Sequence, residues 1–221
     1  MKMNNINSKN YWDARFSSGD WESRRGRFQT QQFAKEQIGF LNLPCDFNGT
    51  LLDFGCGLGD AIPFYKKKFP RAKLIGMDIS SIGIEKCKKR YGSIAEFLVG
   101  SYLDVPKVDV IISSNVFEHL SNDLETANIL AQRCKNLYII VPYREQIKET
   151  SNREHINSYN EESFANLSCV KYNIYESRGL YMMTWLEMVF NIWVKNVFRF
   201  ILRRPMVKPA KQIIFHFKGS L

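Results

Sequence analysis

The sequence predicts one α/β domain built around a mostly parallel sheet. Two observations favour this fold class. Short apolar runs of strand length, bounded by turn residues, alternate along the chain with longer segments of helical spacing. The first confident run, at 50–54, leads directly into a loop with glycines at 55, 57 and 59, which suits a central strand that ends beside a ligand. A length of 221 residues with 45% apolar content fits a single domain with a sizeable core.

Seven strands and six helices are expected. The strands are short apolar segments at 50–54, 73–78, 94–99, 108–114, 137–142, 170–175 and 212–217. The helices are expected at 28–41, 60–69, 81–90, 122–134, 160–167 and 181–204, several of them bounded by Ser, Asn or Pro. Residues 11–27 mix aromatics, glycines and charges without a helical or strand period, so we expect an ordered flap there.

These elements divide the single domain into consecutive parts. Residues 1–45 form the flap and the first helix, and 46–180 form the core, with a polar insertion at 143–160. Residues 181–209 form an apolar and basic helical insertion, and 210–221 contain the last strand.

The loop after the first strand, in T-L-L-D-F-G-C-G-L-G-D, indicates a ligand of particular charge. Gly55, Gly57 and Gly59 carry no side chains, so backbone N–H groups can approach a ligand closely. A dinucleotide loop spaces its glycines G-x-G-x-x-G, whereas the spacing here is G-x-G-x-G. Asp53 and Asp60 flank the loop and would repel a pyrophosphate, but they suit a ligand with ammonium and sulfonium groups.

At this loop the sequence resembles the class I, Rossmann-like S-adenosylmethionine-dependent methyltransferases, whose first motif is acid-x-G-x-G-x-G at the end of strand one. The resemblance implies a seven-stranded sheet with helices on both faces, in which strand seven runs antiparallel between strands five and six. It also implies S-adenosyl-L-methionine as the cofactor. The loop residues expected to bind it are Asp53, Gly55, Cys56, Gly57 and Gly59.

The end of the second strand supports the same cofactor. Asp78 follows Gly59 by 19 residues (78 − 59) and can accept both ribose hydroxyls of an adenosine, while Ile79 would pack on the adenine. The alternative is that Asp78 only caps the next helix. After strand three, Ser101 and Tyr102 are expected near the adenine, although its amino group could be bonded by Ser101 or by Asp104.

The segment after strand four, S-N-V-F-E-H-L, is similar to the S-N-V-L-E-H-L of small-molecule members of the class. The resemblance implies that Asn115 and Val116 line the methionine end of the cofactor. Base N-methylases have a [D/N]-P-P-[Y/F/W] turn at this place, and no proline follows Asn115 here. Methylation of DNA base amino groups is therefore disfavoured.

The N-terminal segment contains a third similarity. Tyr11, Trp12 and Arg15 match a Y-W-x-x-R pattern that, in many members of the class, folds over the bound cofactor. Trp12 and Trp21 could equally be hydrophobic plugs of a short helix.

Candidate groups for acid–base chemistry are few. His119 and His155 fall on loops at the carboxyl ends of strands, where ligands bind in such sheets. His155 is the first candidate for a general base, whereas His119 beside Glu118 could only hold its loop, and His155 could also be an ordinary exposed histidine. His216 alternates with phenylalanines in a strand and is expected to be structural. No metal site is expected, because the five cysteines lack C-x-x-C spacing.

The segment 181–204 is the least ordinary part of the sequence. As a helix it would show a narrow polar stripe on an apolar cylinder. It could be a lid or a dimer helix packed on protein, or it could lie in a membrane interface with Trp185 and Trp193 at headgroup depth. Glu187, Lys195 and Arg199 make a membrane-spanning helix expensive.

Charge is concentrated at the two ends of the chain. The net charge is +9; residues 1–31 have six Lys or Arg and three acids (+3), and residues 181–221 have seven and one (+6). Basic ends suggest an acidic partner, such as nucleic acid, a phosphorylated substrate or an anionic membrane. The start has no apolar stretch like a signal peptide, and the cysteine pattern fits a reducing compartment, so a cytoplasmic protein is expected; a peripheral position at the inner face of the membrane is one interpretation of its C-terminal helix.

The sequence as a whole predicts methyl transfer from S-adenosylmethionine to a small-molecule or glycan acceptor, at oxygen. An RNA methyltransferase is the enzyme alternative. A non-catalytic cofactor-binding protein that acts through its C-terminal helix is the second alternative, and a homodimer is a further interpretation of that helix.

Overall fold

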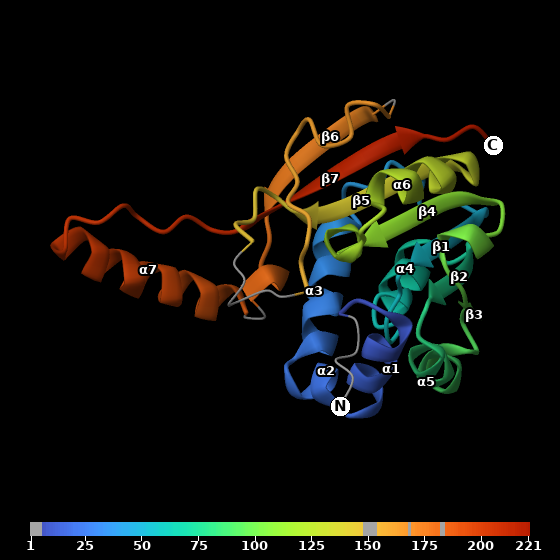
Figure 1. Cartoon of the computed structure of the whole chain (residues 1–221), viewed down its shortest axis with the longest axis horizontal. Coiled ribbons are helices and arrows are strands. Elements are labelled where there is room, and N and C mark those ends of the chain that lie inside the picture. The colour runs from blue at the N-terminus through green and yellow to red at the C-terminus, as the bar shows by residue number, and fades with distance from the viewer. Residues whose placement is uncertain (1–5, 148–153, 168, 182–183) are drawn as a thin grey trace.

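The computed structural model describes residues 6–147, 154–167, 169–181 and 184–221, and its centre is one seven-stranded sheet (Figure 1). The strands are β1 (Thr50–Phe54), β2 (Lys73–Asp78), β3 (Glu96–Val99), β4 (Val108–Ser114), β5 (Cys134–Pro142), β6 (Cys169–Glu176) and β7 (Lys211–Lys218). Their order is β3-β2-β1-β4-β5-β7-β6, and only β7 runs antiparallel to its neighbours β5 and β6. The predicted fold class and the position of the last strand are confirmed.

Helices cover both faces of this sheet. They are α1 (Lys9–Ser17), α2 (Asp20–Ser23), α3 (Gly26–Gln37), α4 (Ile62–Lys68), α5 (Ser81–Tyr91), α6 (Asp123–Gln132) and α7 (Trp185–Ile201), with short 3₁₀ turns η1 (Tyr102–Asp104), η2 (Phe117–His119) and η3 (Gly179–Tyr181). Successive strand side chains point to opposite faces, so Leu51 packs in the cluster with α3, α4 and α5, while Leu52 packs in the cluster with α6. Both leucines are fully buried.

The predicted irregular flap is wrong, because residues 9–23 are mostly helical. Ser8 caps α1 by accepting a hydrogen bond from the backbone N–H of Tyr11. Phe16 is the one buried residue of α1. The helix therefore has almost no apolar period that sequence analysis could detect.

The helix predicted at 160–167 is also wrong, because these residues form turns. The side chain of Asn160 accepts from the backbone N–H of Glu162 (2.9 Å), and the Ser163 hydroxyl accepts from the backbone N–H of Asn160 (2.8 Å). Such local side-chain bonds compete with helical hydrogen bonding. Phe164 holds the turns in place through ring contacts with Phe117 and Phe215.

Helix α7 projects away from the body of the molecule, and the chain returns beside it towards β7 (Figure 1). We call α7 and the returning residues 202–210 the arm. The side chain of Asn196 joins the two halves of the arm, since it bonds both the backbone N–H (2.7 Å) and the carbonyl (3.0 Å) of Val207. Among the described residues, no helix combines the length and apolar character that a bilayer crossing requires.

Candidate active site

The carboxyl ends of the central strands meet at one edge of the sheet, where the glycine loop leaves β1. The backbone N–H groups of Gly55 and Cys56 both donate to the carbonyl of Met77 on β2, at 2.8 and 3.0 Å. Gly55 has φ +75°, and a Cβ there would lie 2.3 Å from a methyl group of Val116. The loop can therefore hold this path only with a glycine at position 55.

A cavity of about 440 Å³ opens at this edge and has the size of a small-ligand site. Most of the residues that the sequence predicts for cofactor or acceptor binding line it. They are Trp12, Arg15, Asp53, Gly55, Cys56, Gly57, Asp78, Ile79, Asn115, Val116, Glu118, His119 and His155. The cavity thus brings together side chains from the N-terminal helix, three strand ends and the polar insertion.

Two carboxyl groups lie in the cavity, that of the buried Asp53 and that of the half-buried Asp78. Asp78 accepts hydrogen bonds from the backbone N–H groups of Gly57 (2.9 Å) and Ser80 (2.8 Å). Burial raises the pKa of Asp78 to about 6. Burial, and then the nearby charge of Asp78, raise the pKa of Asp53 to about 7. The pair would be stabilised by a positively charged ligand.

The N-terminal helix is fastened to the polar insertion across the cavity. Tyr11 and Arg15 both bond one carboxylate oxygen of Glu154. The Trp12 ring packs edge-on against the His119 ring, with centroids 5.4 Å apart. Helix α1 therefore connects the glycine-loop end of the cavity with the insertion that contains Glu154 and His155.

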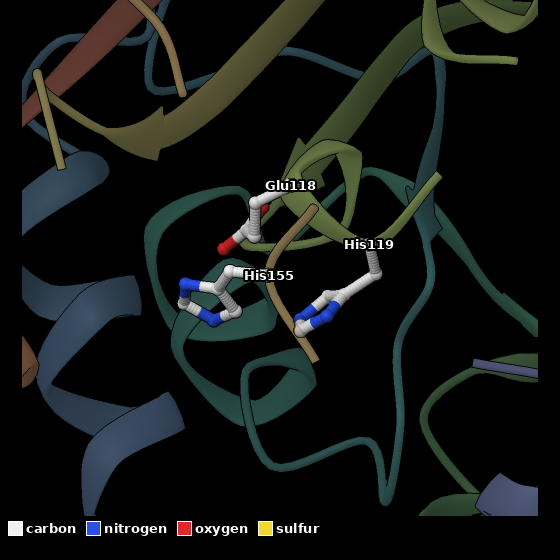
Figure 2. Close-up of side chains that lie close together, drawn as sticks. All are labelled: Glu118, His119 and His155. Carbon is white, nitrogen blue, oxygen red and sulfur yellow. The ribbon is translucent and has the colours of Figure 1, made fainter. Parts of the chain in front are cut away.

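Glu118, His119 and His155 form a cluster in the cavity wall and point towards one another (Figure 2). Glu118 is 1% exposed, and burial raises its pKa to about 7. The Nδ1 of His119 lies 3.0 Å from the Glu154 carbonyl, and burial lowers the pKa of this histidine to about 4. His155 Nδ1 lies 2.7 Å from a Glu145 oxygen; burial opposes protonation, but the bond to Glu145 outweighs it and the pKa of His155 is raised.

Backbone hydrogen bonds explain why residues so distant in sequence meet. The backbone N–H groups of Ile156 and Asn157 both donate to the carbonyl of Glu118, at 2.7 and 3.2 Å. The Tyr159 hydroxyl donates to the carbonyl of Phe117 at 2.9 Å. The insertion is thereby anchored on η2, with His155 directed towards Glu118.

Some predicted residues lie elsewhere. Tyr11, Gly59, Ser101 and Tyr102 are not among the lining residues. Gly59 packs against Cys87, Tyr91 and Phe97, and Ser101 caps η1 in a capping box with Asp104.

Asp60 does not flank the ligand, contrary to the charge argument made from the sequence. It is buried, and it accepts from the Tyr91 hydroxyl at 2.8 Å and pairs with Arg90 (3.3 Å) and Arg27 (3.4 Å). These partners neutralise Asp60 within the protein, so the acidic pair that faces the cavity is Asp53 and Asp78.

The sequence analysis did not single out several lining residues. Glu145 lies in the insertion, where charged residues are common and no spacing distinguished it, whereas Glu154 belongs to an E-H-(about eight)-F stretch, Glu154-His155 followed by Phe164, that resembles the one covering the substrate side in this class. Helix α3 also lines the cavity, through Gln29, Thr30, Phe33 and Gln37 among others. The only feature of the sequence that could have indicated this lining is the presence of polar residues on a helix that also has a buried apolar face.

Comparisons with known proteins agree with this fold. Residues 52–137 match a family model described as "Methyltransferase domain". A chain from the complex of the Haloferax volcanii methyltransferase activator Trm112 has a TM-score of 0.68 at 16% identity, over 95% of this chain and 98% of that one. The plantazolicin methyltransferase BpumL in complex with SAH has a TM-score of 0.55 at 21% identity, over 94% and 90%. The Haemonchus contortus phosphoethanolamine N-methyltransferase 2 in complex with S-adenosyl-L-methionine has a TM-score of 0.63 at 13% identity, over 89% and 57%.

The strand order and the acid-flanked glycine loop define a Rossmann-like methyltransferase domain of class I, and the matched segment contains both the loop and the S-N-V-F-E-H-L motif. Residues 52–137 are therefore similar to a methyltransferase domain, the fold is that of the class I enzymes, and both indicate S-adenosylmethionine as the cofactor.

Cofactor affinity should rise with pH. A bound cation favours the charged carboxylates of Asp53 and Asp78, so binding releases protons below about pH 7, and affinity should increase up to about tenfold per pH unit there. The stability of the cofactor-free protein should change with pH in the opposite direction. The pKa of Asp53 in the folded state is above its ordinary value of 3.8, so the free energy of unfolding falls as pH rises towards 7.

For cofactor binding, calorimetric titration in buffers of different ionisation enthalpy measures the proton release, which Asp53→Asn should reduce. Equal affinity at both ends of this pH range would contradict the prediction.

Proposed function

We propose that the chain transfers a methyl group from S-adenosylmethionine to a hydroxyl oxygen of a small-molecule or glycan acceptor. The observation that carries this proposal is the Glu118, His119 and His155 cluster, which lines the same cavity as the glycine loop. Acid–base groups with shifted pKa values beside a cofactor pocket are typical of catalytic sites, and a module that only binds the cofactor does not need them. Their presence also favours an acceptor that must lose a proton.

The reaction is an in-line displacement. The acceptor oxygen forms a bond to the methyl carbon as the carbon–sulfur bond breaks, and the electron pair leaves on sulfur as the neutral thioether of S-adenosylhomocysteine. The protein has to align oxygen, methyl and sulfur and to exclude water. It must also promote loss of the hydroxyl proton. The candidate base is His155, whose ring is held by Glu145.

The decisive experiment is a methyl-transfer assay with isotopically labelled S-adenosylmethionine against sugars, lipid-linked glycans, amines and RNA, followed by location of the methyl group in the product. We expect methylation of a hydroxyl on a sugar or lipid-linked glycan. Transfer to RNA or to an amine would overturn the acceptor proposed. Cofactor binding without transfer to any acceptor would support the non-catalytic alternative.

The arm supports an acceptor at a membrane, and we propose that it binds the surface of an anionic bilayer. Large apolar side chains are exposed on α7, including Phe190 (66%) and Trp193 (62%). Exposed cations accompany them in the arm: Lys195, Arg203, Arg204 and Lys208, against the single acid Glu187. Aromatics that enter the headgroup region beside cations that bind lipid phosphates are typical of interfacial helices. The side chain of Trp185 lies outside the described residues.

Vesicle binding tests the arm. The chain should cosediment with vesicles that contain phosphatidylglycerol and much less with neutral vesicles, and added salt should weaken binding. Phe190→Glu combined with Trp193→Glu should weaken it by at least about tenfold, because burying each aromatic contributes about 1.5–3 kcal/mol. Leu103→Glu, at an exposed leucine of the body, is the matched control. A concentration-dependent dimer without vesicle binding would show instead that a second copy covers the arm.

A further inference from the structure

Glu118 is a buried carboxyl group whose two oxygens accept no hydrogen bond from another described residue. Both of these oxygens are inaccessible to solvent. Buried carboxylates are normally paired, hydrogen-bonded or bound to a metal ion. Three carboxyl groups, of Glu118, Glu145 and Glu154, line this part of the cavity, and Glu154 is paired with Arg15. A positive charge in the cluster would satisfy Glu118.

The two histidines are oriented as metal ligands are. The Nδ1 of His119 faces the Glu154 carbonyl and the Nδ1 of His155 faces the Glu145 carboxylate, and both of these partners accept hydrogen bonds, so Nδ1 carries the proton. In each ring this leaves the Nε2 lone pair available. Metal-binding histidines usually donate their other N–H to a carbonyl or carboxylate in this way.

The three side chains are close enough to share one ion. One ligand atom of each lies within 4.8 Å of those of the other two, and Figure 2 shows the side chains converging. Ligand atoms about 2.1 Å from a metal are separated by about 3–3.5 Å, so modest side-chain rotations would close the site. The candidate site therefore depends on three converging side chains, one of them buried, and not on a helix terminus or on exposed carboxylates.

We propose that Glu118, His119 and His155 bind one divalent transition-metal ion, which holds and activates the acceptor hydroxyl. Two imidazole nitrogens and one carboxylate favour Mn²⁺, Fe²⁺, Co²⁺ or Zn²⁺ over Mg²⁺ and Ca²⁺, which prefer oxygen ligands. Three protein ligands also leave coordination positions open for a substrate. The sequence analysis expected no metal site because it considered only the spacing of the cysteines. It did not consider Glu118, His119 and His155, because His155 lies more than 30 residues after the other two.

This inference rests on the proposed function and changes the role of His155 in it. An acceptor hydroxyl bound to the ion becomes more acidic, so its proton can pass to bulk water without a protein base. The oxygen then forms the bond to the methyl carbon as the carbon–sulfur bond breaks, and S-adenosylhomocysteine leaves. His155 acts as a ligand, and Glu145 positions it through Nδ1.

Metal binding can be measured without turnover. The full chain, stripped with a chelator, is titrated with Mn²⁺ by electron paramagnetic resonance and with Co²⁺ by visible absorption. We expect one ion per chain, a cobalt spectrum of mixed nitrogen and oxygen ligation, and at least about 100-fold weaker binding in Glu118→Gln and in His155→Ala. Glu162→Gln, which removes an exposed carboxylate from the same insertion, should bind as the unmodified chain does.

The outcomes separate this inference from the proposed function. S-adenosylmethionine binding by the stripped chain, measured in parallel, shows that the protein and its cofactor pocket are intact. If neither ion binds, if both variants bind like the unmodified chain, or if methyl transfer survives chelation, the metal site is overturned while the proposed function stands. If the ion binds at the cluster but no hydroxyl acceptor is methylated, the metal site stands and the proposed acceptor is wrong.

Discussion

Gly57→Val and Asp78→Ala should each weaken S-adenosylmethionine binding by about 100-fold or more, since loss of a charged hydrogen bond costs about 1.5–3 kcal/mol and further contacts are lost with it. Gly57 has φ +54°, a left-handed conformation that a β-branched residue adopts only with strain. Asp78 accepts the Gly57 N–H, so its loss removes both the expected ribose acceptor and an anchor of the loop.

Calorimetric titration with S-adenosylmethionine and with S-adenosylhomocysteine measures this loss. Gly39→Val is the matched control, because no atom lies within 4 Å of a Cβ at Gly39 and its φ is not in the left-handed region. Asp46→Ala removes an exposed acid as the second control. Unimpaired binding by both cavity variants would place the cofactor elsewhere, and binding of NAD in its place would contradict the class assignment.

Replacing a histidine of the cluster should abolish most turnover and leave cofactor binding intact. His155→Ala and His119→Gln should each lower kcat by about 10²–10⁴-fold, the usual range for a group that promotes proton loss. The Kd for S-adenosylmethionine should stay close to that of the unmodified chain, because the cofactor contacts of the glycine loop and Asp78 are untouched. The same direction is expected whether His155 acts as a ligand or as a base.

Initial rates with the acceptor identified by the transfer assay measure this effect, with thermal unfolding as a check on folding. His216→Gln is the matched control: His216 lies in β7, stacks on Tyr138 and does not line the cavity. Full turnover in both cluster variants would remove the cluster from the chemistry. An unmodified chain without turnover would leave no catalytic role for either histidine.

The central part of the fold was predictable because its signals are local. The bounds predicted for β1, β2 and β4 are those observed, since each is a short apolar run that ends in an acid or serine or directly before a glycine. Gly55, Gly57 and Asp78 line the cavity for the same reason: the ends of neighbouring parallel strands meet at one edge of the sheet. The place of β7 between β5 and β6 came from the family resemblance, because nothing in its composition specifies its neighbours.

The helical N-terminus was not predictable in the same way. Helix α1 directs Trp12 and Arg15 into a cavity rather than into a core, so the apolar spacing that marks a helix is missing. For Asp60, the sequence predicted a ligand contact that the structure does not contain. Its place beside the loop suggested a ligand contact, but Tyr91 and Arg90, about 30 residues further along the chain, bind it within the protein.

The sequence by itself indicated the class of protein, because the glycine spacing after Asp53 and the S-N-V-F-E-H-L motif are each contiguous and impose their geometry over a few residues. Only the tertiary structure decided how the cluster is assembled and how the arm is displayed. Glu118 and His155 meet through backbone bonds between η2 and the insertion, and α7 keeps its apolar side chains exposed because the described body does not cover them. The cluster depends on contacts that form between segments distant in sequence, and the exposure of the arm depends on contacts that do not form. Neither can be recognised from a local stretch of the sequence.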